Sequence, residues 1–240
     1  MPHQCSSVIE AREQAVANTA LTGDVTQCSK GRVYYIIGAS GCGKDSLISA
    51  IRQHFVNDVV VAHRYITRAA DAGGENHVEL TEDEFFVRYS RNMFAMSWKA
   101  HGFSYGIGQE VLHWSDLGLS VVVNGSRAYL DVAKELFGER LVPVVIHVDT
   151  HILEQRLIQR GREDSEQIAQ RLKRASEYRV AKETGAFFID NGGTLEQSVE
   201  QFSTLKQSLE SNLELNLEAS LKQGLEARNK TLNKDKEVIE

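Results

Sequence analysis

The chain alternates continuous apolar runs with segments that repeat apolar residues at helical spacing. The runs are rich in β-branched residues, as in strands that are covered on both faces of a parallel sheet. They predict strands at residues 32–37, 59–62, 120–124, 142–148 and, more briefly, 187–189. Helical spacing predicts helices at residues 44–55, 82–91, 128–136, 151–159 and 165–178. This order indicates an α/β fold of three layers, with right-handed crossovers around a parallel central sheet.

The two ends of the chain differ from this central domain, which we place at residues 31–204. Residues 1–30 are polar, with one weak helical stretch at 8–21, and we interpret them as an N-terminal extension. In the tail at 205–240, leucine recurs every four residues from Leu205 to Leu225. A four-residue step drifts by about 40° per repeat on a helix. The tail is therefore expected to be an amphipathic or partly disordered helix, and self-association into a homo-oligomer stays open.

A glycine-rich loop with a lysine follows the first predicted strand and precedes a helix. Glycines let a backbone wrap a phosphate group, and the N–H groups of the loop and helix N-terminus favour an anion. The pattern G-x-x-x-x-G-K predicts a nucleotide-phosphate site for ATP, with Lys44 as a catalytic residue that reaches the β- and γ-phosphates. The residues expected to contact the nucleotide are Gly38, Ala39, Ser40, Gly41, Cys42, Gly43, Lys44, Asp45 and Ser46.

Asp45 stands where such loops usually carry serine or threonine, whose hydroxyl binds Mg²⁺. A carboxylate can do the same, directly or through water, because Mg²⁺ prefers hard oxygen ligands. The alternatives are Ser46, which is about 100° further around the helix, and a structural role for Asp45 as an acid that complements the helix dipole. We take Asp45 as the candidate metal ligand.

Composition bounds the class of protein. The chain has 240 residues, 42% hydrophobic and 25% charged, which is ordinary for a globular domain. A net charge of −6 gives no overall basic signature for nucleic acid. The three cysteines form neither a disulfide framework nor a zinc pattern. No membrane-spanning stretch or signal peptide is evident, so we expect a cytoplasmic enzyme that acts on a small molecule.

Arginines after the second predicted strand suggest a second phosphate site. Arg64 and Arg68 flank Thr67 near the end of this strand, where ligands bind in folds of this class. Two guanidinium groups can hold a phosphate by bidentate contacts. The alternative is that both arginines are solvated surface residues. Arg127, which follows residues 124–126 at the end of the third strand, raises the same two possibilities.

Two further segments are candidates for covering the substrates. The aromatic, glycine-rich stretch 98–106 predicts a small antiparallel segment or loop, in which His101 is either a ligand contact or merely exposed. A second segment clusters arginines around Gly161 and predicts a mobile helical lid whose positive charge stabilises a transferring phosphoryl group. The alternative is a solvated helix pair with internal salt bridges. Its candidate catalytic residues are Arg160, Arg162 and Arg171.

In this order, the motifs resemble the guanylate kinase superfamily of phosphate-loop kinases, over residues 31–204. The resemblance is carried by the loop, by the Thr67-Arg68 pair, by the segment that ends with Tyr105 and Gly106, and by the arginine spacing of the lid. It implies that Tyr105 contributes to the substrate site. It also implies that Asn191, after the last strand, contributes to nucleotide binding.

The departures from guanylate kinases concern base recognition. Those enzymes read guanine with carboxylates, but the matching positions here hold Met96 and the run Asn124-Gly125-Ser126. A site that lacks these polar groups loses its preference for the base. A second substrate arginine just after Arg68 is also absent. Guanine is therefore not the expected substrate.

These variant features are similar to those of ribose 1,5-bisphosphate phosphokinases, the guanylate-kinase-like family of phosphonate degradation. The shared runs are Gly-Lys-Asp-Ser at 43–46 and residues 62–68, 74–77 and 123–127. The resemblance implies ATP-dependent phosphorylation of the C1 phosphate of ribose 1,5-bisphosphate, giving 5-phosphoribosyl 1-diphosphate. Arg64, Arg68 and Arg127 would bind phosphate, and Asn76, His77 and Asn124 would bind sugar hydroxyls. Two alternatives stay open, a nucleoside monophosphate kinase and an inactive guanylate-kinase-like binding module.

Overall fold

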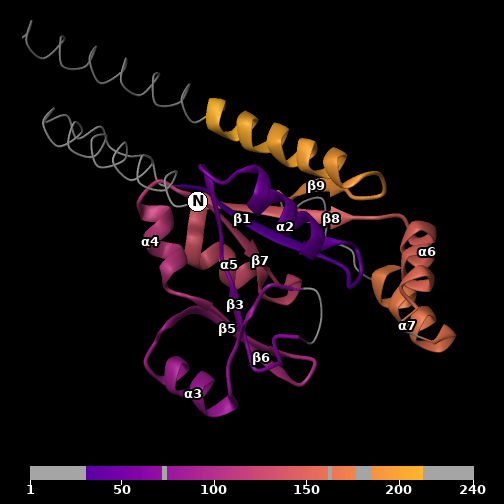
Figure 1. The fold of residues 1–240 in the computed structure, drawn as a ribbon. Coiled ribbons are helices and arrows are strands. Elements are labelled where there is room, and N and C mark those ends of the chain that lie inside the picture. Colours follow the sequence, from indigo (N-terminus) through magenta and orange to yellow (C-terminus); the bar gives the residue numbers. More distant parts are fainter. Residues whose placement is uncertain (1–30, 72–74, 162–163, 177–184, 213–240) are drawn as a thin grey trace, which may run out of the picture.

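The computed structural model describes residues 31–71, 75–161, 164–176 and 185–212. Its centre is a five-stranded sheet in which every pair of neighbouring strands is parallel (Figure 1). In spatial order the strands are β2 (Val59–Val61), β7 (Ser120–Asn124), β1 (Val33–Gly38), β8 (Leu141–His147) and β9 (Phe187–Asp190). All five strands predicted from the apolar runs are confirmed, and the parallel α/β fold with them.

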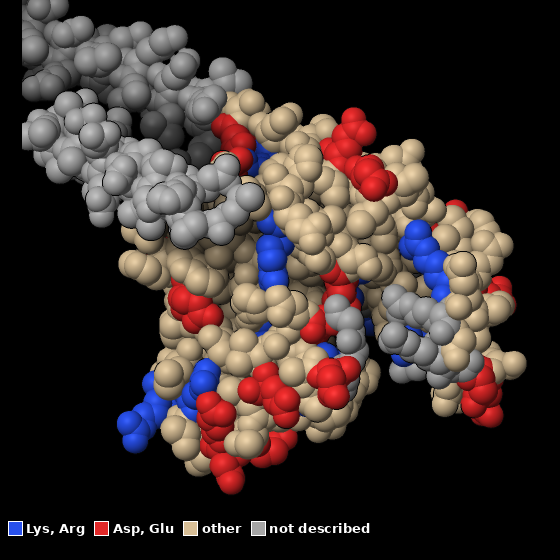
Figure 2. Space-filling view, in the orientation of Figure 1, with Lys and Arg blue, Asp and Glu red and all other residues tan. Residues whose placement is uncertain are grey.

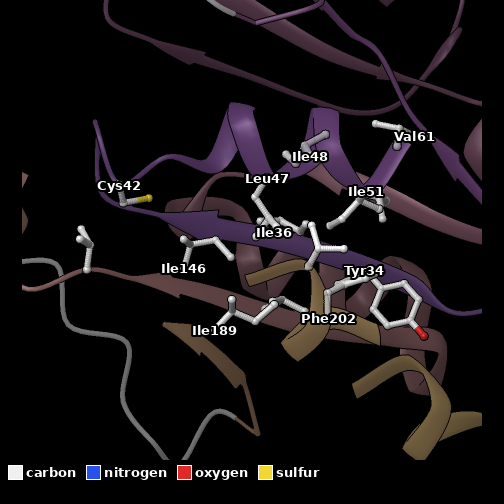
Figure 3. Packing of buried hydrophobic residues seen from close by; sticks show 14 of the residues in the cluster. Tyr34, Ile36, Cys42, Leu47, Ile48, Ile51, Val61, Ile146, Ile189 and Phe202 are labelled. Atoms are coloured by element: carbon white, nitrogen blue, oxygen red, sulfur yellow. The ribbon is translucent and has the colours of Figure 1, made fainter. Parts of the chain in front are cut away.

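Helices cover both faces of this sheet, because strand β1 is apolar on both sides. Tyr34 and Ile36 pack in one hydrophobic cluster, and Val33, Tyr35 and Ile37 pack in the other. The first cluster joins β1 to α2 (Lys44–His54) and to a final helix that starts at residue 195 (Figure 3). Residues of α6 (Thr150–Arg160) belong to the same cluster. The second cluster joins β1 to α4 (Glu110–Asp116) and α5 (Leu130–Phe137), which follows the 3₁₀ turn η1 (Arg127–Tyr129). The three predicted layers are therefore present.

A second, four-stranded sheet lies beside the central one and builds one wall of the site. Its strands, in spatial order, are β4 (Val78–Glu79), β3 (Arg64–Ile66), β6 (Phe103–Gly108) and β5 (Phe94–Ala100). Strands β5 and β6 form the antiparallel segment expected within residues 98–106, and they are joined by His101 and Gly102, with φ of 51° and 80°. The short strands β3 and β4 and helix α4 were not predicted. Helix α3 (Glu82–Ser90) connects β4 to β5.

Helix α6 and helix α7 (Ser165–Ser176) form the predicted helical pair at one end of the sheet (Figure 1). Gly161 ends α6 with φ of 62°, a left-handed conformation that suits glycine at a helix terminus. The final helix runs without a break from residue 195 to residue 212, so the expected boundary between domain and tail at 204/205 falls within it. Leu205 and Leu209 pack against the first cluster. No helix in the described ranges is long and apolar enough to cross a membrane.

Candidate active site

The phosphate loop joins β1 to α2 at the carboxyl end of the central sheet, where folds of this class bind ligands. Gly41 and Gly43 both have φ of 89°, a conformation that glycine adopts without the steric cost of a Cβ atom. A Cβ atom on Gly43 would lie 2.3 Å from Nδ2 of Asn191. The loop therefore requires glycine at position 43 for both conformation and space.

The three polar residues after the loop glycines face different spaces. Nζ of Lys44 donates a hydrogen bond to the carbonyl oxygen of Gly38 at 3.3 Å, which holds the ammonium group close to the loop. Lys44 and Asp45 line one cleft, whereas Ser46 lines a separate hollow of about 450 Å³. Asp45 is thus the candidate metal ligand that shares a space with Lys44.

This cleft, of about 570 Å³, brings together most of the predicted site residues. In Figure 2 a hollow separates the lower part of the molecule, which carries β5 and β6, from helices α6 and α7. The cationic residues that line the cleft are Lys44, Arg64, Arg68, Arg127 and Arg171. The acidic residues that line it are Asp45 and Glu75. One space therefore joins the phosphate loop to the predicted arginines of the acceptor site and to one arginine of the lid.

Glu75 organises the two arginines of the acceptor side. Its carboxylate accepts hydrogen bonds from Nε and Nη2 of Arg64 and pairs with Nη2 of Arg68 at 3.4 Å. Burial opposes ionisation of Glu75, but hydrogen bonds and charges from both arginines outweigh it and lower the pKa of its carboxyl group. Arg64 lies in β3 and Arg68 lies beyond its end, so the two guanidinium groups meet at this shared carboxylate and not on one face of a helix.

Asn124 links this ion-pair group to the phosphate loop. It ends β7 and is buried, and its Nδ2 donates to Oδ1 of Asp45 at 3.2 Å and to Oε1 of Glu75 at 3.3 Å. The predicted role of Asn124 was to bind a sugar hydroxyl. That role stays a prediction, since the amide nitrogen of Asn124 bridges the two carboxylates of the cleft while its Oδ1 is buried and has no hydrogen-bond partner among the described residues.

Three other residues predicted to bind substrate make contacts within the protein. Oγ1 of Thr67 accepts a hydrogen bond from the backbone N–H of Ser104 at 2.9 Å, which fixes β6 beside the end of β3. His77 is buried, and its Nε2 lies 3.0 Å from the carbonyl oxygen of Arg68. Asn76 lies 3.2 Å from Nε2 of His63. None of Thr67, Asn76 and His77 lines the main cleft, so their substrate contacts stay a prediction.

Aromatic side chains from β5 and β6 form one wall of the cleft. The rings of Trp98 and Tyr105 are stacked, with centroids 5.5 Å apart and an interplanar angle of 3°. Cζ of Arg64 lies 5.1 Å from the ring centroid of Tyr105, a favourable cation–π contact. Met96, at the position of the guanine-reading carboxylate in guanylate kinases, is buried in the second cluster. Both rings are buried and already in contact with each other, so this wall supports Arg64 and carries an apolar side chain in place of the base-reading carboxylate.

The hydroxyl of Tyr35 fixes the loop after β7 by two hydrogen bonds. It donates to the carbonyl oxygen of Ser126 at 3.1 Å and accepts from the N–H of Ser126 at 2.9 Å. Burial raises the pKa of Tyr35 to about 12, so the hydroxyl keeps the proton that this pair of hydrogen bonds needs. The fixed backbone at Ser126 places Arg127 at the edge of the cleft.

Arginines of the lid reach the phosphate loop. Nη1 of Arg171 lies 4.0 Å from the position that a Cβ atom would take on Gly41. Nη1 of Arg156 lies 3.8 Å from the equivalent position on Gly43 and also lines the hollow that contains Ser46. The side chain of Arg160 and the whole of Arg162 lie outside the described residues, and their catalytic roles stay predictions.

Asn191 contacts the backbone of the phosphate loop. Its Nδ2 donates to the carbonyl oxygen of Cys42 at 2.7 Å, and its Oδ1 accepts from Oγ of Ser198 at 2.8 Å. Asn191 is buried and lines the same hollow as Ser46. The resemblance implied a nucleotide-binding role for Asn191, and the structure adds a direct contact with the loop itself.

The residues present suit a magnesium ion that is bound largely by its substrate. Within the described ranges, no three His, Cys, Asp or Glu side chains are grouped so that they could hold a metal ion. Mg²⁺ in kinase sites typically takes one or two carboxylates, with phosphate oxygens and water as its other ligands. Asp45, beside Lys44 in the cleft, fits that arrangement as the protein ligand.

Sequence reasoning missed Glu75 and Trp98 as site residues. Glu75 lies in the run 74–77 that carries the family resemblance, but that resemblance implies no role for it. The missing signal was three-dimensional, because Glu75 is 11 residues from Arg64 and 49 residues from Asn124. Trp98 opens the predicted covering segment, but its stacking on Tyr105 depends on the register of β5 and β6.

Comparison with known proteins identifies the family. No family model matches the chain. A protein of Klebsiella pneumoniae named ribose 1,5-bisphosphate phosphokinase PhnN is 48% identical over 178 residues, which cover 74% of this chain and 94% of the relative. Proteins of the same name from Enterobacter lignolyticus and Pantoea vagans are 51% and 50% identical, over 72% and 75% of this chain and 89% and 97% of their own lengths.

The fold has a matching relative among solved structures. The guanylate kinase of Anaplasma phagocytophilum superimposes with a TM-score of 0.56 at 19% identity, over 75% of this chain and 86% of that enzyme. This likeness confirms the guanylate-kinase-like, phosphate-loop fold. The curated relatives are much closer in sequence and cover most of the described domain. The chain belongs to the family of ribose 1,5-bisphosphate phosphokinases PhnN, a family of kinases.

Proposed function

We propose that the protein transfers the γ-phosphoryl group of ATP to the C1 phosphate of ribose 1,5-bisphosphate, giving 5-phosphoribosyl 1-diphosphate and ADP. The observation that carries this proposal is the identity of 48–51% to relatives named for this substrate, over at least 89% of their lengths. The proposal places the enzyme in the cytoplasm, in phosphonate catabolism and in the supply of its diphosphate product.

The cleft supports an acceptor that is recognised by its phosphates. The two carboxylates that line it already have partners, Glu75 with two arginines and Asp45 with Asn124. With Asp45 proposed to bind Mg²⁺ and Glu75 paired with the arginines, no described carboxylate that lines the cleft is left to read the edge of a base. Arg64 and Arg68 suit a sugar phosphate, because guanidinium groups bind phosphate, and the ring of Tyr105 supports Arg64.

The chemistry needs positioning and charge neutralisation more than proton transfer. An oxygen of the acceptor phosphate forms a bond to the γ-phosphorus while the bond from that phosphorus to the bridging oxygen of ADP breaks, and ADP leaves with the electron pair. The acceptor oxygen is already ionised, so no general base is required. Lys44 and Arg171 place positive charge beside the loop, where negative charge spreads over the transferring group. Mg²⁺ bound at Asp45 would add neutralisation of the nucleotide phosphates.

A parallel acceptor panel tests the proposal. ADP formation is measured with ribose 1,5-bisphosphate, GMP and UMP, each with ATP and Mg²⁺, and 5-phosphoribosyl 1-diphosphate is identified directly. We expect turnover with ribose 1,5-bisphosphate and little with either nucleotide. Lys44→Ala, which removes the ammonium group beside the loop, should abolish turnover while the far-ultraviolet circular dichroism spectrum stays unchanged. Efficient phosphorylation of GMP or UMP, or full activity of Lys44→Ala, contradicts the proposal.

A further inference from the structure

Glu75 is a buried carboxylate at the cleft that belongs neither to the phosphate loop nor to the lid. Its side chain is 10% exposed, less than the 15% of Arg64 and the 22% of Arg68 that it holds. Asn124 gives it a third donor at 3.3 Å. The carboxylate therefore lies at least as deep as the two guanidinium groups, with donors from three side chains around it.

The contacts of Glu75 leave donors of both arginines available. On Arg64 it occupies the edge formed by Nε and Nη2, and a guanidinium group has five N–H donors arranged in a planar fork. The opposite edge of Arg64 carries Nη1. On Arg68 the carboxylate contacts Nη2, while the Nε of Arg68 is buried and has no hydrogen-bond partner among the described residues. Nη1 of Arg64 and Nη1 of Arg68 also have no hydrogen-bond partner among the described residues, and both side chains line the cleft, so these donors are left for the acceptor oxygens of a ligand.

Two neighbouring guanidinium groups repel each other unless an anion lies between them. Glu75 supplies that anion permanently, so the arginines are held in place before any phosphate arrives. Tyr105 supports Arg64 from another side, with its ring centroid 5.1 Å from Cζ. The three charges of Arg64, Arg68 and Glu75 leave one net positive charge for a ligand. A pair that is preorganised in this way binds an anion with less loss of side-chain freedom.

We propose that Glu75 is a positioning residue for acceptor binding, which holds Arg64 and Arg68 at the cleft that both line and leaves their remaining N–H donors for the acceptor. The inference rests on the proposed function in so far as the acceptor is a phosphorylated sugar. It differs from a competing possibility, in which the carboxylate of Glu75 merely occupies the place of the acceptor phosphate and is displaced by it.

Steady-state kinetics with Glu75→Gln separates these roles. The variant keeps the shape of the side chain and removes its charge. We expect KM for ribose 1,5-bisphosphate to rise about tenfold or more, as for the loss of a charge-assisted contact, while KM for ATP stays within about twofold. The matched control is Glu84→Gln on α3, which removes a carboxylate paired with Arg88 at 2.7 Å outside the cleft and should change neither constant.

Three results overturn the proposal. A lower KM for the acceptor in Glu75→Gln means that the carboxylate competes with substrate. An acceptor KM equal to that of Glu84→Gln means that Glu75 has no part in binding. An equal rise in both KM values means a general loss of structure. A double variant adds a further test, because Glu75→Gln should have little additional effect in an Arg64→Ala background if Glu75 acts through Arg64.

A binding measurement keeps this inference separate from the proposed function. Inorganic phosphate is titrated calorimetrically into the full chain saturated with a non-hydrolysable ATP analogue and Mg²⁺. We expect the wild type to bind phosphate at least about tenfold more tightly than Glu75→Gln. If the wild type binds phosphate but does not phosphorylate ribose 1,5-bisphosphate, the proposed function fails and the role of Glu75 is still judged by this difference. Equal affinities in the two proteins overturn the role of Glu75, whatever the acceptor.

Discussion

Replacing Asn191 by alanine should weaken ATP binding through the phosphate loop. Nδ2 of Asn191 donates to the carbonyl oxygen of Cys42 at 2.7 Å. A trans peptide points its C=O and the following N–H in opposite directions. The hydrogen bond to Asn191 therefore aims the N–H of Gly43 away from Asn191, toward the side of the loop where phosphate is proposed to bind. Without it, the peptide between Cys42 and Gly43 is free to turn.

The magnitude follows from the groups left without partners. The carbonyl of buried Cys42 loses its donor, which costs about 1–3 kcal/mol of unfolding free energy. The hydroxyl of Ser198 loses Oδ1 of Asn191 but retains two backbone carbonyl acceptors within 3.4 Å, so it adds little. For a domain of this size, Tm should fall by about 2–12 °C. Losing one aligned N–H to a charged phosphate costs about 1.5–3 kcal/mol, so KM for ATP should rise about tenfold or more.

Urea unfolding and ATP-dependent kinetics are measured on Asn191→Ala and on Ser198→Ala. The second variant removes the hydroxyl behind Asn191 but keeps the bond from Asn191 to Cys42. We expect it to lose about 1 kcal/mol of stability and to keep the KM for ATP of the wild type. If Asn191→Ala is destabilised to the predicted extent but binds ATP as well as Ser198→Ala does, the orientation of the loop peptide does not depend on Asn191 and the reasoning is wrong.

Three further predictions concern metal, pH and packing. Asp45→Asn keeps the size of the side chain and should raise the Mg²⁺ concentration for half-maximal rate at least about tenfold. Even changes to groups that only support a metal ligand typically lower metal affinity or activity about 10–100-fold. An unchanged Mg²⁺ titration excludes the ligand role. The lowered pKa of Glu75 stabilises the fold above its ordinary pKa of 4.5, and this contribution is lost as the pH falls through the folded-state pKa. Urea unfolding between pH 6 and about pH 3 should therefore show a less steep loss of stability in Glu75→Gln than in the wild type, and equal slopes contradict the shift. Gly125→Ala would place a Cβ atom 2.3 Å from the ring of fully buried Tyr35, so it should lower the unfolding free energy by about 1–3 kcal/mol, and an unchanged urea midpoint means that the ring can move.

The central sheet could be predicted because its strands are buried on both faces. Strands β1, β7 and β8 appear in the sequence as continuous apolar runs, which few other elements produce. Strands β3 and β4 have three and two residues and are only partly apolar. They form through pairing with neighbouring strands, β3 with β6 and β4 with β3. That pairing is a property of the assembled second sheet and leaves no periodic signal in either segment.

The same contrast between local and distant contacts divides the site. The phosphate loop is local, because its glycines, its lysine and its helix follow one another, and the motif alone placed all of them. The acceptor side is assembled from separate segments, with Arg64 on β3, Glu75 before β4 and Asn124 at the end of β7. The spacing of Arg64 and Arg68 indicated a phosphate site, but the carboxylate that joins them could not be inferred from spacing.

The charges in the cleft bear on why a lid is needed. Five cationic and two acidic side chains line it, a net charge of +3. Both proposed substrates together carry about seven to eight negative charges, at up to two for each terminal phosphate. The negative charge of the substrates therefore exceeds the positive charge of the cleft. One Mg²⁺ lowers this excess by two charges and does not remove it. Transfer of a phosphoryl group between two anions is helped by neutralising that excess. The helical pair already places Arg171 beside Gly41, and supplying further positive charge is the role predicted for Arg160 and Arg162.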